Sequence, residues 1–248
     1  MINLKIAIQK SGRLNEDSLT LLKECGISIN NGKDQLMAQA SNFRLDVLYL
    51  RNSDIPQYVR DGVADIAIIG DNTEKEKKTG IRHVLDLGFS RCRLSIAVPK
   101  NVDFQDISYL QGKKIATSYP NSLKDFLTEN DIEAEIHEIS GSVEIAPNIG
   151  LADAICDLVS SGSTLFKNGL KEVYKIFESQ AILVANSGLC GEKQELLAQL
   201  VFRIKAVLAA KYNKYILLNA PEKALDQICR LLPGMKSPTI MPLRENGW

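Results

Sequence analysis

Short apolar runs alternate with stretches whose apolar positions recur at helical spacing, from the first residues onward. This pattern predicts a strand over 4–9, a helix over 15–26 and a strand over 44–51. A short helix over 53–62 leads to a strand over 64–70, which is apolar nearly throughout, as in strands buried on both faces. The order strand, helix, strand favours parallel pairing with right-handed crossovers.

A second β/α series is predicted in the middle of the chain. Residues 71–80 are rich in charge and are predicted to form a solvated loop. The later elements are strands over 92–100, 112–120, 134–140 and 152–159, a helix over 121–130, and a short helix over 142–150 that Pro147 distorts. Asn121 or Ser122 is expected to cap the helix over 121–130. Residues 172–187 are typical of a β-hairpin or of two neighbouring strands.

The longest predicted helix covers 192–213 and carries an apolar stripe suited to core packing. A strand over 214–221, a helix over 222–234 and a strand over 237–243 follow it. A βαβ fragment this short buries its own sheet face poorly, so it either packs on the preceding lobes or belongs to a third small domain. The chain is therefore predicted to be α/β, with two lobes and a cleft.

Composition narrows the function classes. Of 248 residues, 45% are apolar, and 30 Lys and Arg balance 30 Asp and Glu, which gives no bulk attraction to nucleic acid or to an anionic membrane. The N-terminus does not resemble a signal peptide, and no apolar run approaches the roughly 18 residues of a membrane helix. Five scattered cysteines and two histidines argue against a disulfide framework or structural zinc, so free thiols in the cytoplasm are expected.

A segment of small and hydroxylic residues follows the strand over 152–159 and precedes a possible helix. It consists of Ser160, Ser161, Gly162, Ser163 and Thr164. Unpaired amides, the helix dipole and the hydroxyls would suit a phosphate monoester, and the glycine would permit close approach. The alternative is a helix cap with no ligand. The segment is not a Walker loop, because no Gly-Lys-Ser/Thr follows.

Two carboxylates precede this segment on the same predicted strand. Asp153 and Asp157 are four residues apart, so both side chains point to one face. Acids a few ångströms from a phosphate would accept hydrogen bonds from sugar hydroxyls or meet Mg²⁺. The alternative for Asp153 is that it only caps a turn.

Cations stand at two predicted strand ends near the N-terminus. Lys10, Gly12 and Arg13 lie in the turn after the first strand, and Arg51 ends the strand over 44–51. Cations at such places suit a polyanion such as pyrophosphate, although each one alone is more often a solvated charge.

Two further strand-end turns carry Asp71 and Tyr119. Asp71 would accept from an exocyclic amine, and Tyr119 would either stack on a base or pack the hinge. No pairing of a nucleophile with a base stands out in the sequence. The chemistry is therefore expected to need charge stabilisation and positioning.

Several of these segments resemble the ATP phosphoribosyltransferase family, whose members catalyse the first step of histidine biosynthesis. The similar segments are 5–14, 51–72, 92–99, 113–120, 141–170 and 214–221, in order along the chain. The block over 141–170 is the most specific of them.

The resemblance implies a core similar to type II periplasmic binding proteins. One lobe would comprise 1–99 plus 184–213, and the other 100–183. The implied reaction is that of a pentosyltransferase: N1 of ATP joins C1 of 5-phosphoribosyl 1-pyrophosphate, pyrophosphate leaves, and Mg²⁺ is used. By this resemblance Ser160–Thr164 hold the 5-phosphate, Asp153 and Asp157 approach the ribose, and the cations meet the pyrophosphate.

The resemblance is incomplete at the C-terminus. The long form of the family carries an ACT-like βαββαβ domain that binds histidine, and 214–248 resembles only its first half. A partial regulatory domain, weak or absent histidine feedback, and a homodimer in place of the long form's hexamer are therefore expected.

Two other functions are compatible with the sequence. A solute-binding or sensor protein of the same fold would lack catalysis, although the absence of a signal peptide counts against a periplasmic carrier. A regulatory subunit with an inactive site is the second, and the intact Lys10, Arg13 and Arg51 argue against it.

Overall fold

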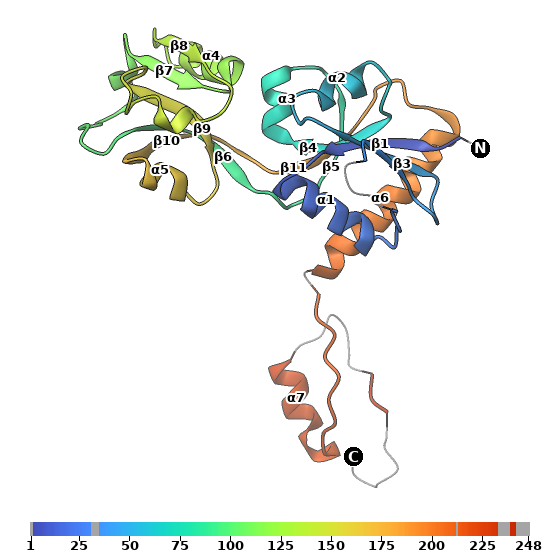
Figure 1. The fold of residues 1–248 in the computed structure, drawn as a ribbon. Helices are drawn as coiled ribbons and strands as arrows, with labels where there is room; N and C mark the ends of the chain where they lie inside the picture. The colour runs from blue at the N-terminus through green and yellow to red at the C-terminus, as the bar shows by residue number, and fades with distance from the viewer. Residues whose placement is uncertain (1, 31–34, 212, 233–238, 242–248) are drawn as a thin grey trace. The chain divides into compact units, whose positions relative to one another are not determined.

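The computed structural model describes residues 2–30, 35–211, 213–232 and 239–241 (Figure 1). The chain divides into two compact units, Met1–Leu208 and Ala209–Trp248. The first unit contains two β-sheets, and we call each sheet with its helices a lobe.

The sheet of the first lobe has six strands in the order β2-β3-β1-β4-β11-β5. Their bounds are β1 Leu4–Gln9, β2 Met37–Gln39, β3 Leu45–Leu50, β4 Ile66–Gly70, β5 Arg82–Asp86 and β11 Ala181–Ala185. β1 pairs in parallel with β3 and β4, as the alternating pattern predicts. β2, β11 and β5 join antiparallel to their neighbours.

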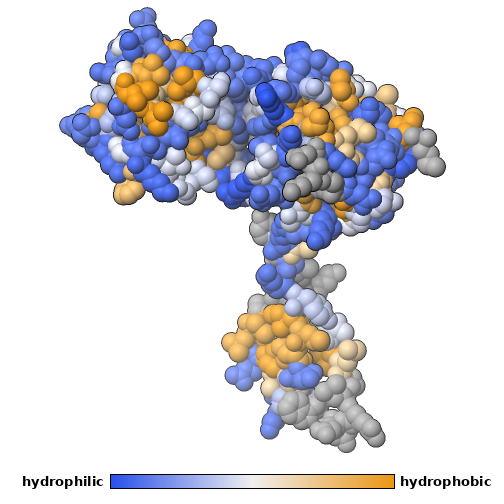
Figure 2. All heavy atoms as spheres, viewed as in Figure 1, coloured by the Kyte–Doolittle hydropathy of each residue, from blue (hydrophilic) through white to orange (hydrophobic). Residues whose placement is uncertain are grey.

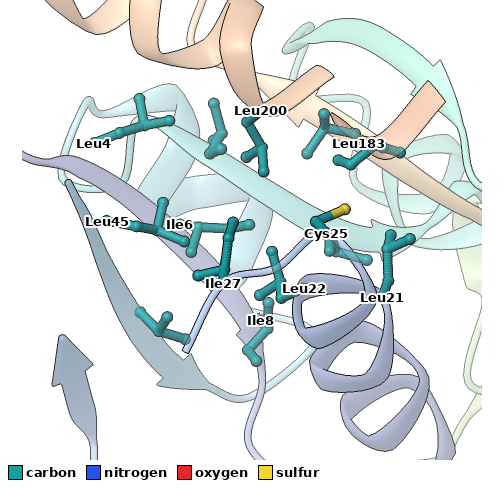
Figure 3. Packing of buried hydrophobic residues seen from close by; sticks show 14 of the residues in the cluster. Leu4, Ile6, Ile8, Leu21, Leu22, Cys25, Ile27, Leu45, Leu183 and Leu200 are labelled. Carbon is teal, nitrogen blue, oxygen red and sulfur yellow. The ribbon is translucent and has the colours of Figure 1, made fainter. Parts of the chain in front are cut away.

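Helices cover both faces of this sheet. α1 (Arg13–Glu24) and α6 (Gly191–Lys211) lie on one face, and α2 (Ile55–Arg60) and α3 (Asp71–Lys77) on the other (Figure 1). In the core, Leu22 of α1 and Leu200 of α6 point toward sheet residues such as Ile6 and Leu183 (Figure 3). All four side chains are fully buried, so burial of this apolar face accounts for the docking of both helices.

The second lobe has a five-stranded sheet in the order β10-β6-β9-β7-β8. Its strands are β6 Cys92–Pro99, β7 Lys114–Thr117, β8 Glu135–Glu138, β9 Ala154–Val159 and β10 Leu170–Ser179. β7 is parallel to β8 and β9, whereas β6 is antiparallel to β9 and β10. Its helical segments are η1 (Ile107–Leu110), α4 (Pro120–Glu129), η2 (Val143–Ile145) and α5 (Ser163–Lys167).

The chain crosses between the sheets twice, after β5 and after β10. β6 lies in the second sheet, so the border expected between 99 and 100 falls before Cys92. β11 lies wholly in the first sheet, which places the return crossing at Gln180 and not after 183. Of the two alternatives predicted over 172–187, the hairpin is wrong, because β10 and β11 belong to different sheets, whereas two strands that follow one another along the chain do form.

Residues 71–77 form helix α3, so the solvated loop predicted over 71–80 is wrong. Three of its side chains are buried, namely Asn72, Thr73 and Glu76. An ion pair of 2.6 Å between Lys75 and Asp71, one turn apart, supports the exposed side. The charged residues of the segment thus lie mainly on the exposed face of α3, and the opposite face is buried in the protein.

Two predicted helix starts in the second lobe also change. α4 begins at Pro120 with Tyr119 at the N-cap position, so neither Asn121 nor Ser122 is its cap. Of the helix predicted over 142–150, only the 3₁₀ segment η2 forms, and Pro147 lies beyond it.

The unit Ala209–Trp248 contains the 3₁₀ turn η3 (Glu222–Ala224) and helix α7 (Leu225–Leu231) among its described residues. Residues 214–221 form no strand, which contradicts the prediction, and the strand predicted over 237–243 lies largely outside the described residues. Figure 2 shows a broad hydrophobic surface on this unit, among whose residues Leu217 and Leu231 are more than 70% exposed. No helix within the described ranges is long and apolar enough to cross a membrane.

Candidate functional site

Parallel pairing brings the strand ends of the first lobe to one edge. Gln9 lies opposite Leu50 in the register of β1 and β3, so Lys10 and Arg51 are the next residues of two adjacent strands. The N–H of Lys10 donates to the carbonyl oxygen of Leu50 at 2.8 Å, which keeps the two ends together. Both side chains belong to exposed residues. The two predicted cations therefore lie side by side at the carboxyl edge of the sheet.

The turn after β1 depends on a glycine. Gly12 has φ +88° and occupies the N-cap position of α1, a conformation that side-chain-bearing residues rarely adopt. The turn makes Arg13 the first residue of α1, and the residue is exposed. Asp17, one turn later, lies 3.8 Å from its Nε. This geometry keeps the Arg13 guanidinium at the surface of the first lobe.

Asp71 follows β4 directly and therefore lies at the same carboxyl edge. Its carboxylate pairs with Lys75, and its N–H donates to the carbonyl oxygen of Gln180. The neighbouring Asn72 is buried and exchanges two hydrogen bonds of 2.9 Å with the Ser179 hydroxyl. Asp71 is thus fixed where the chain crosses between the sheets.

The segment Ser160–Thr164 connects β9 to α5 in the second lobe. Gly162 takes the left-handed conformation with φ +76° and is the N-cap of α5. The hydroxyl of Ser161 donates to the hydroxyl of Ser163 at 3.1 Å, and the N–H of Ser163 lies a long 3.4 Å from the Ser161 oxygen. The predicted strand, turn and helix start are confirmed, and the hydroxyls gather on one exposed turn.

A partly exposed ion pair holds the first residue of this turn. Nε and Nη2 of Arg93 each donate to one carboxylate oxygen of Glu172 at 2.5 Å. Ser95 adds a hydrogen bond to the same carboxylate at 2.8 Å, and Nη1 of Arg93 donates to the carbonyl oxygen of Ser160 at 3.1 Å. Glu172 accordingly has a lowered pKa, chiefly through the hydrogen bonds from Arg93.

The two lobes meet at Arg13 and Ser160. Nη1 of Arg13 lies 3.4 Å from the hydroxyl oxygen of Ser160, although the two residues are 147 positions apart. A cavity of about 590 Å³ opens beside this contact. Its lining residues are Asp71, Asp86, Arg91, Cys92, Arg93, Ser160, Glu178, Ser179, Gln180 and Ile182. The structure thus joins the cation-bearing turn of one lobe to the small-residue turn of the other.

Asp157 of β9 and Tyr119, which precedes α4, are partly buried polar residues of the second lobe. Burial raises the pKa of Asp157 to about 6, and the charge of Glu144 adds to the effect, while the N–H of Leu158 opposes it. Burial also raises the pKa of Tyr119, as does the charge of Asp157. The Tyr119 hydroxyl is 3.4 Å from Nδ2 of Asn72 in the first lobe. The carboxyl group of Asp157 therefore changes its protonation state near its pKa of about 6.

Asp153 takes no part in this cluster. It precedes β9, and its carboxylate accepts the N–H of Lys114 at 2.9 Å at the opposite end of the sheet. Four residues of strand at ~3.3 Å each separate it from Asp157. The two aspartates share the predicted parity, but Asp153 accepts a main-chain N–H where β7 and β9 begin, whereas Asp157 lies toward the other end of β9.

The sequence interpretation missed Arg93 and Glu144. Arg93 stands out in the sequence as a charged residue within an apolar strand. Its role could not be predicted, because its partner Glu172 lies on a distant strand that pairs with it only in the folded sheet. Glu144 lies in the turn segment before β9, and no local pattern ties it to Asp157.

Comparison with known proteins gives a consistent result. The family model described as ATP phosphoribosyltransferase (HisG) matches residues 51–206, and the model of the HisG C-terminal domain matches 210–248. An ATP phosphoribosyltransferase of Cytophaga hutchinsonii is 58% identical over 245 residues, covering 99% of this chain and 86% of that protein. One from Phocaeicola vulgatus is 54% identical, with 99% and 87% covered.

Solved structures agree with these relatives. A chain of the ATP phosphoribosyl transferase (HisG:HisZ) complex from Thermotoga maritima superimposes with a TM-score of 0.72 at 29% identity, covering 84% of this chain and 99% of that chain. The substrate-binding protein of an amino acid ABC transporter reaches a TM-score of 0.56 at 12% identity, covering 84% and 94%, which shows the fold alone. The bilobal α/β core expected from the resemblance is confirmed.

The segment over 141–170, the most specific part of the resemblance, lies entirely within the first of the two matched regions. The two family models together cover 51–206 and 210–248, and the two relatives, at 58% and 54% identity, cover 99% of the chain. The chain therefore belongs to the ATP phosphoribosyltransferase (HisG) family.

Proposed function

We propose that the reaction of this family, transfer of the phosphoribosyl group of phosphoribosyl pyrophosphate to N1 of ATP, takes place where Arg13 meets Ser160. The observation that carries this proposal is the 3.4 Å contact between these residues of different lobes. A donor with a phosphate at one end and a pyrophosphate at the other requires two anion sites facing one cleft, and these two turns supply them.

The turn Ser160–Thr164 takes the 5-phosphate in this proposal. Gly162 carries no Cβ and holds a left-handed conformation, so a phosphate oxygen can approach the backbone closely. The serine and threonine hydroxyls are exposed and able to donate.

The cations of the first lobe take the pyrophosphate. Lys10 and Arg51 lie on adjacent strand ends and Arg13 opens α1. As the bond from C1 to the leaving oxygen lengthens, negative charge grows on the pyrophosphate and positive charge on the sugar. Fixed cations near the leaving group stabilise that separation without a covalent intermediate or a strong general base.

Asp157 takes the ribose hydroxyls, because it is a half-buried acceptor close to the turn. Asp71 and Tyr119 are proposed to contact the adenine of ATP, the first as an acceptor for the exocyclic amine and the second as an aromatic surface. Support for Tyr119 comes from its hydrogen bond to Asn72, which places it between the lobes.

Mg²⁺ remains a prediction for this site. Among the described residues, no group of three or more His, Cys, Asp or Glu side chains is placed to hold a metal ion. The part of the chain that the structure describes thus offers no cage of its own, and the expected ion would arrive on the oxygens of the donor's pyrophosphate, as Mg²⁺ often does. We assign it no step.

The oligomeric state and the cellular location remain predictions for this chain. We propose a homodimer for this chain, to be measured by light scattering, and a cytoplasmic location, where ATP and phosphoribosyl pyrophosphate are both available. The HisG:HisZ complex named above is a multi-chain assembly, which supports an oligomer of some kind.

The test of the proposed function is release of pyrophosphate. Incubation with ATP, phosphoribosyl pyrophosphate and Mg²⁺ should release pyrophosphate, and omission of either substrate should abolish it. Release that does not require ATP would indicate hydrolysis of the donor and contradict the proposal. Omission of Mg²⁺ in a further arm tests the metal separately.

A further inference from the structure

Helix α4 of the second lobe begins without a cap of its own. Tyr119 occupies the N-cap position and makes no side-chain capping bond, and Pro120 at the first helical position has no N–H to donate. Asn121 and Ser122 are therefore the first residues whose amides need acceptors outside the helix.

Both acceptors come from the first lobe. Oε1 of Glu76 accepts the N–H of Asn121 at 2.9 Å, and Oε2 accepts the N–H of Ser122 at 2.9 Å and its hydroxyl at 2.8 Å. The Asn121 side chain returns a hydrogen bond of 3.1 Å to the carbonyl oxygen of Glu76. A carboxylate of α3 thus caps a helix in the other lobe, where the helix dipole also favours its charge.

The neighbouring Glu74 shows that this arrangement is not a general property of α3. Glu74 accepts from the Thr79 hydroxyl and from the N–H of Gly80, so it closes the end of its own helix. Glu76 is 6% exposed, and within the described residues its carboxylate accepts hydrogen bonds from Asn121 and Ser122 of the second lobe. The ion pair between Lys78 and Asp125 at 2.5 Å also joins the lobes. It is about half exposed, so it contributes little to the stability of their contact.

We propose that Glu76 is a positioning residue for the reaction: its cap on α4 holds the two lobes in the arrangement in which Arg13 reaches Ser160. Separation of the lobes would withdraw the carboxylate from the helix end and leave the Asn121 and Ser122 amides to water. Tyr119, the residue before the helix, would move away from Asn72 in the same step. The inference rests on the proposed placement of phosphoribosyl pyrophosphate across both lobes.

The expected effect is on binding and not on the chemical step. A ligand that contacts both lobes binds only the closed arrangement, so its apparent affinity falls with the fraction of molecules that are closed. Saturating substrate restores the closed state. Loss of the Glu76 cap should therefore raise KM for phosphoribosyl pyrophosphate and leave kcat nearly unchanged.

The experiment compares Glu76→Gln with Glu74→Gln, a change of the same chemistry two positions away. For Glu76→Gln, KM for phosphoribosyl pyrophosphate should rise about tenfold with kcat within about twofold of the parent. For Glu74→Gln, both constants should match the parent. Ser122→Ala removes one of the bonds and should raise the same KM about threefold. The double variant should show less than the product of the two single effects, because both changes break a shared interaction.

An unchanged KM in Glu76→Gln, or a fall in kcat alone, overturns the proposal, since either would make Glu76 a structural residue only. If Glu76→Gln does not fold, Ser122→Ala decides in the same way. The substitution Gly162→Val, in the proposed phosphate-binding turn, distinguishes a failure of the Glu76 proposal from a failure of the proposed binding site. If Gly162→Val raises KM and Glu76→Gln does not, the cap is irrelevant and the site stands. If neither raises it, the placement of the donor itself is wrong.

Discussion

Arg93 and Ser160 are joined by a hydrogen bond of 3.1 Å from Nη1 to the main-chain carbonyl oxygen of Ser160. The other two guanidinium nitrogens of Arg93 are held by Glu172 at 2.5 Å each. A planar guanidinium fixed along one edge presents its third nitrogen in a set direction. The position of the Ser160–Thr164 turn is thereby tied to β6 and β10 of the sheet beneath it.

Arg93→Lys should loosen that turn, because one ammonium group cannot hold both Glu172 oxygens and the Ser160 carbonyl. We expect the free energy of unfolding to fall by about 1–3 kcal/mol, measured in urea. KM for phosphoribosyl pyrophosphate should rise in the same variant. The control is Arg91→Lys, which changes another arginine of the same cavity and should alter neither quantity comparably. Equal losses in both variants would contradict the role assigned to Arg93.

The pKa of Asp157 near 6 makes a prediction about stability and pH. The ordinary value of 3.8 applies in the unfolded chain, so the folded chain binds this proton more tightly. The stability contributed by protonated Asp157 is complete below pH ~4 and is lost as pH rises to about 6. The parent therefore loses free energy of unfolding over this range, and Asp157→Asn, which cannot titrate, does not. The difference in free energy of unfolding should shift in favour of the variant by about 3 kcal/mol between pH 4 and pH 7.

Urea unfolding at several pH values checks this difference. Asp103→Asn, which changes an exposed aspartate of the same lobe, separates the effect of the buried carboxyl from a general effect of charge. A stability difference between Asp157→Asn and the parent that stays constant from pH 4 to pH 7 would show that Asp157 is not desolvated.

Individual strands and turns could be predicted where neighbouring residues alone determine them. β4 and β9 are nearly continuous apolar runs, and turn residues end them, so both strands and the turn at Ser160 could be found directly. The crossing at Gln180 could not, because residues 172–187 look alike on both sides of it. Only tertiary pairing decides that β10 joins β6 while β11 joins β4.

The candidate site divides in the same way. Arg13 and Ser160 were predictable because each lies in a strand-end turn, and their contact follows from the fold. Asp153 lies far from Asp157 along β9, which parity could not show because it says nothing of position along a strand. Glu76 lies in a segment whose charge suggested a loop, and its function depends on Ser122, which is 46 residues away. Residues that act on a distant element leave no local pattern.

Arg13→Ala should reduce kcat by about 10²- to 10³-fold, as expected for loss of one group that stabilises developing charge. The side chain is exposed and its contacts in the described chain are a long hydrogen bond and a loose ion pair, so the melting temperature should hardly change. Steady-state pyrophosphate release and thermal melts measure the two effects. Lys23→Ala, at the other end of α1, is the matched control and should keep the parent's kcat. A near-normal kcat for Arg13→Ala would remove this residue from the mechanism.

Gly162→Val tests the turn itself, and Gly169→Val provides the control, because both glycines have left-handed backbones with φ +76° and φ +71°. A β-branched residue is strained at either position, so each variant should lose about 1–3 kcal/mol of stability. Only Gly162 lies within Ser160–Thr164, where a side chain would stand between the backbone and a phosphate. We therefore expect KM for phosphoribosyl pyrophosphate to rise at least tenfold in Gly162→Val and to stay near the parent's in Gly169→Val. If the two variants lose stability equally and neither changes KM, the turn is a helix cap and the 5-phosphate binds elsewhere.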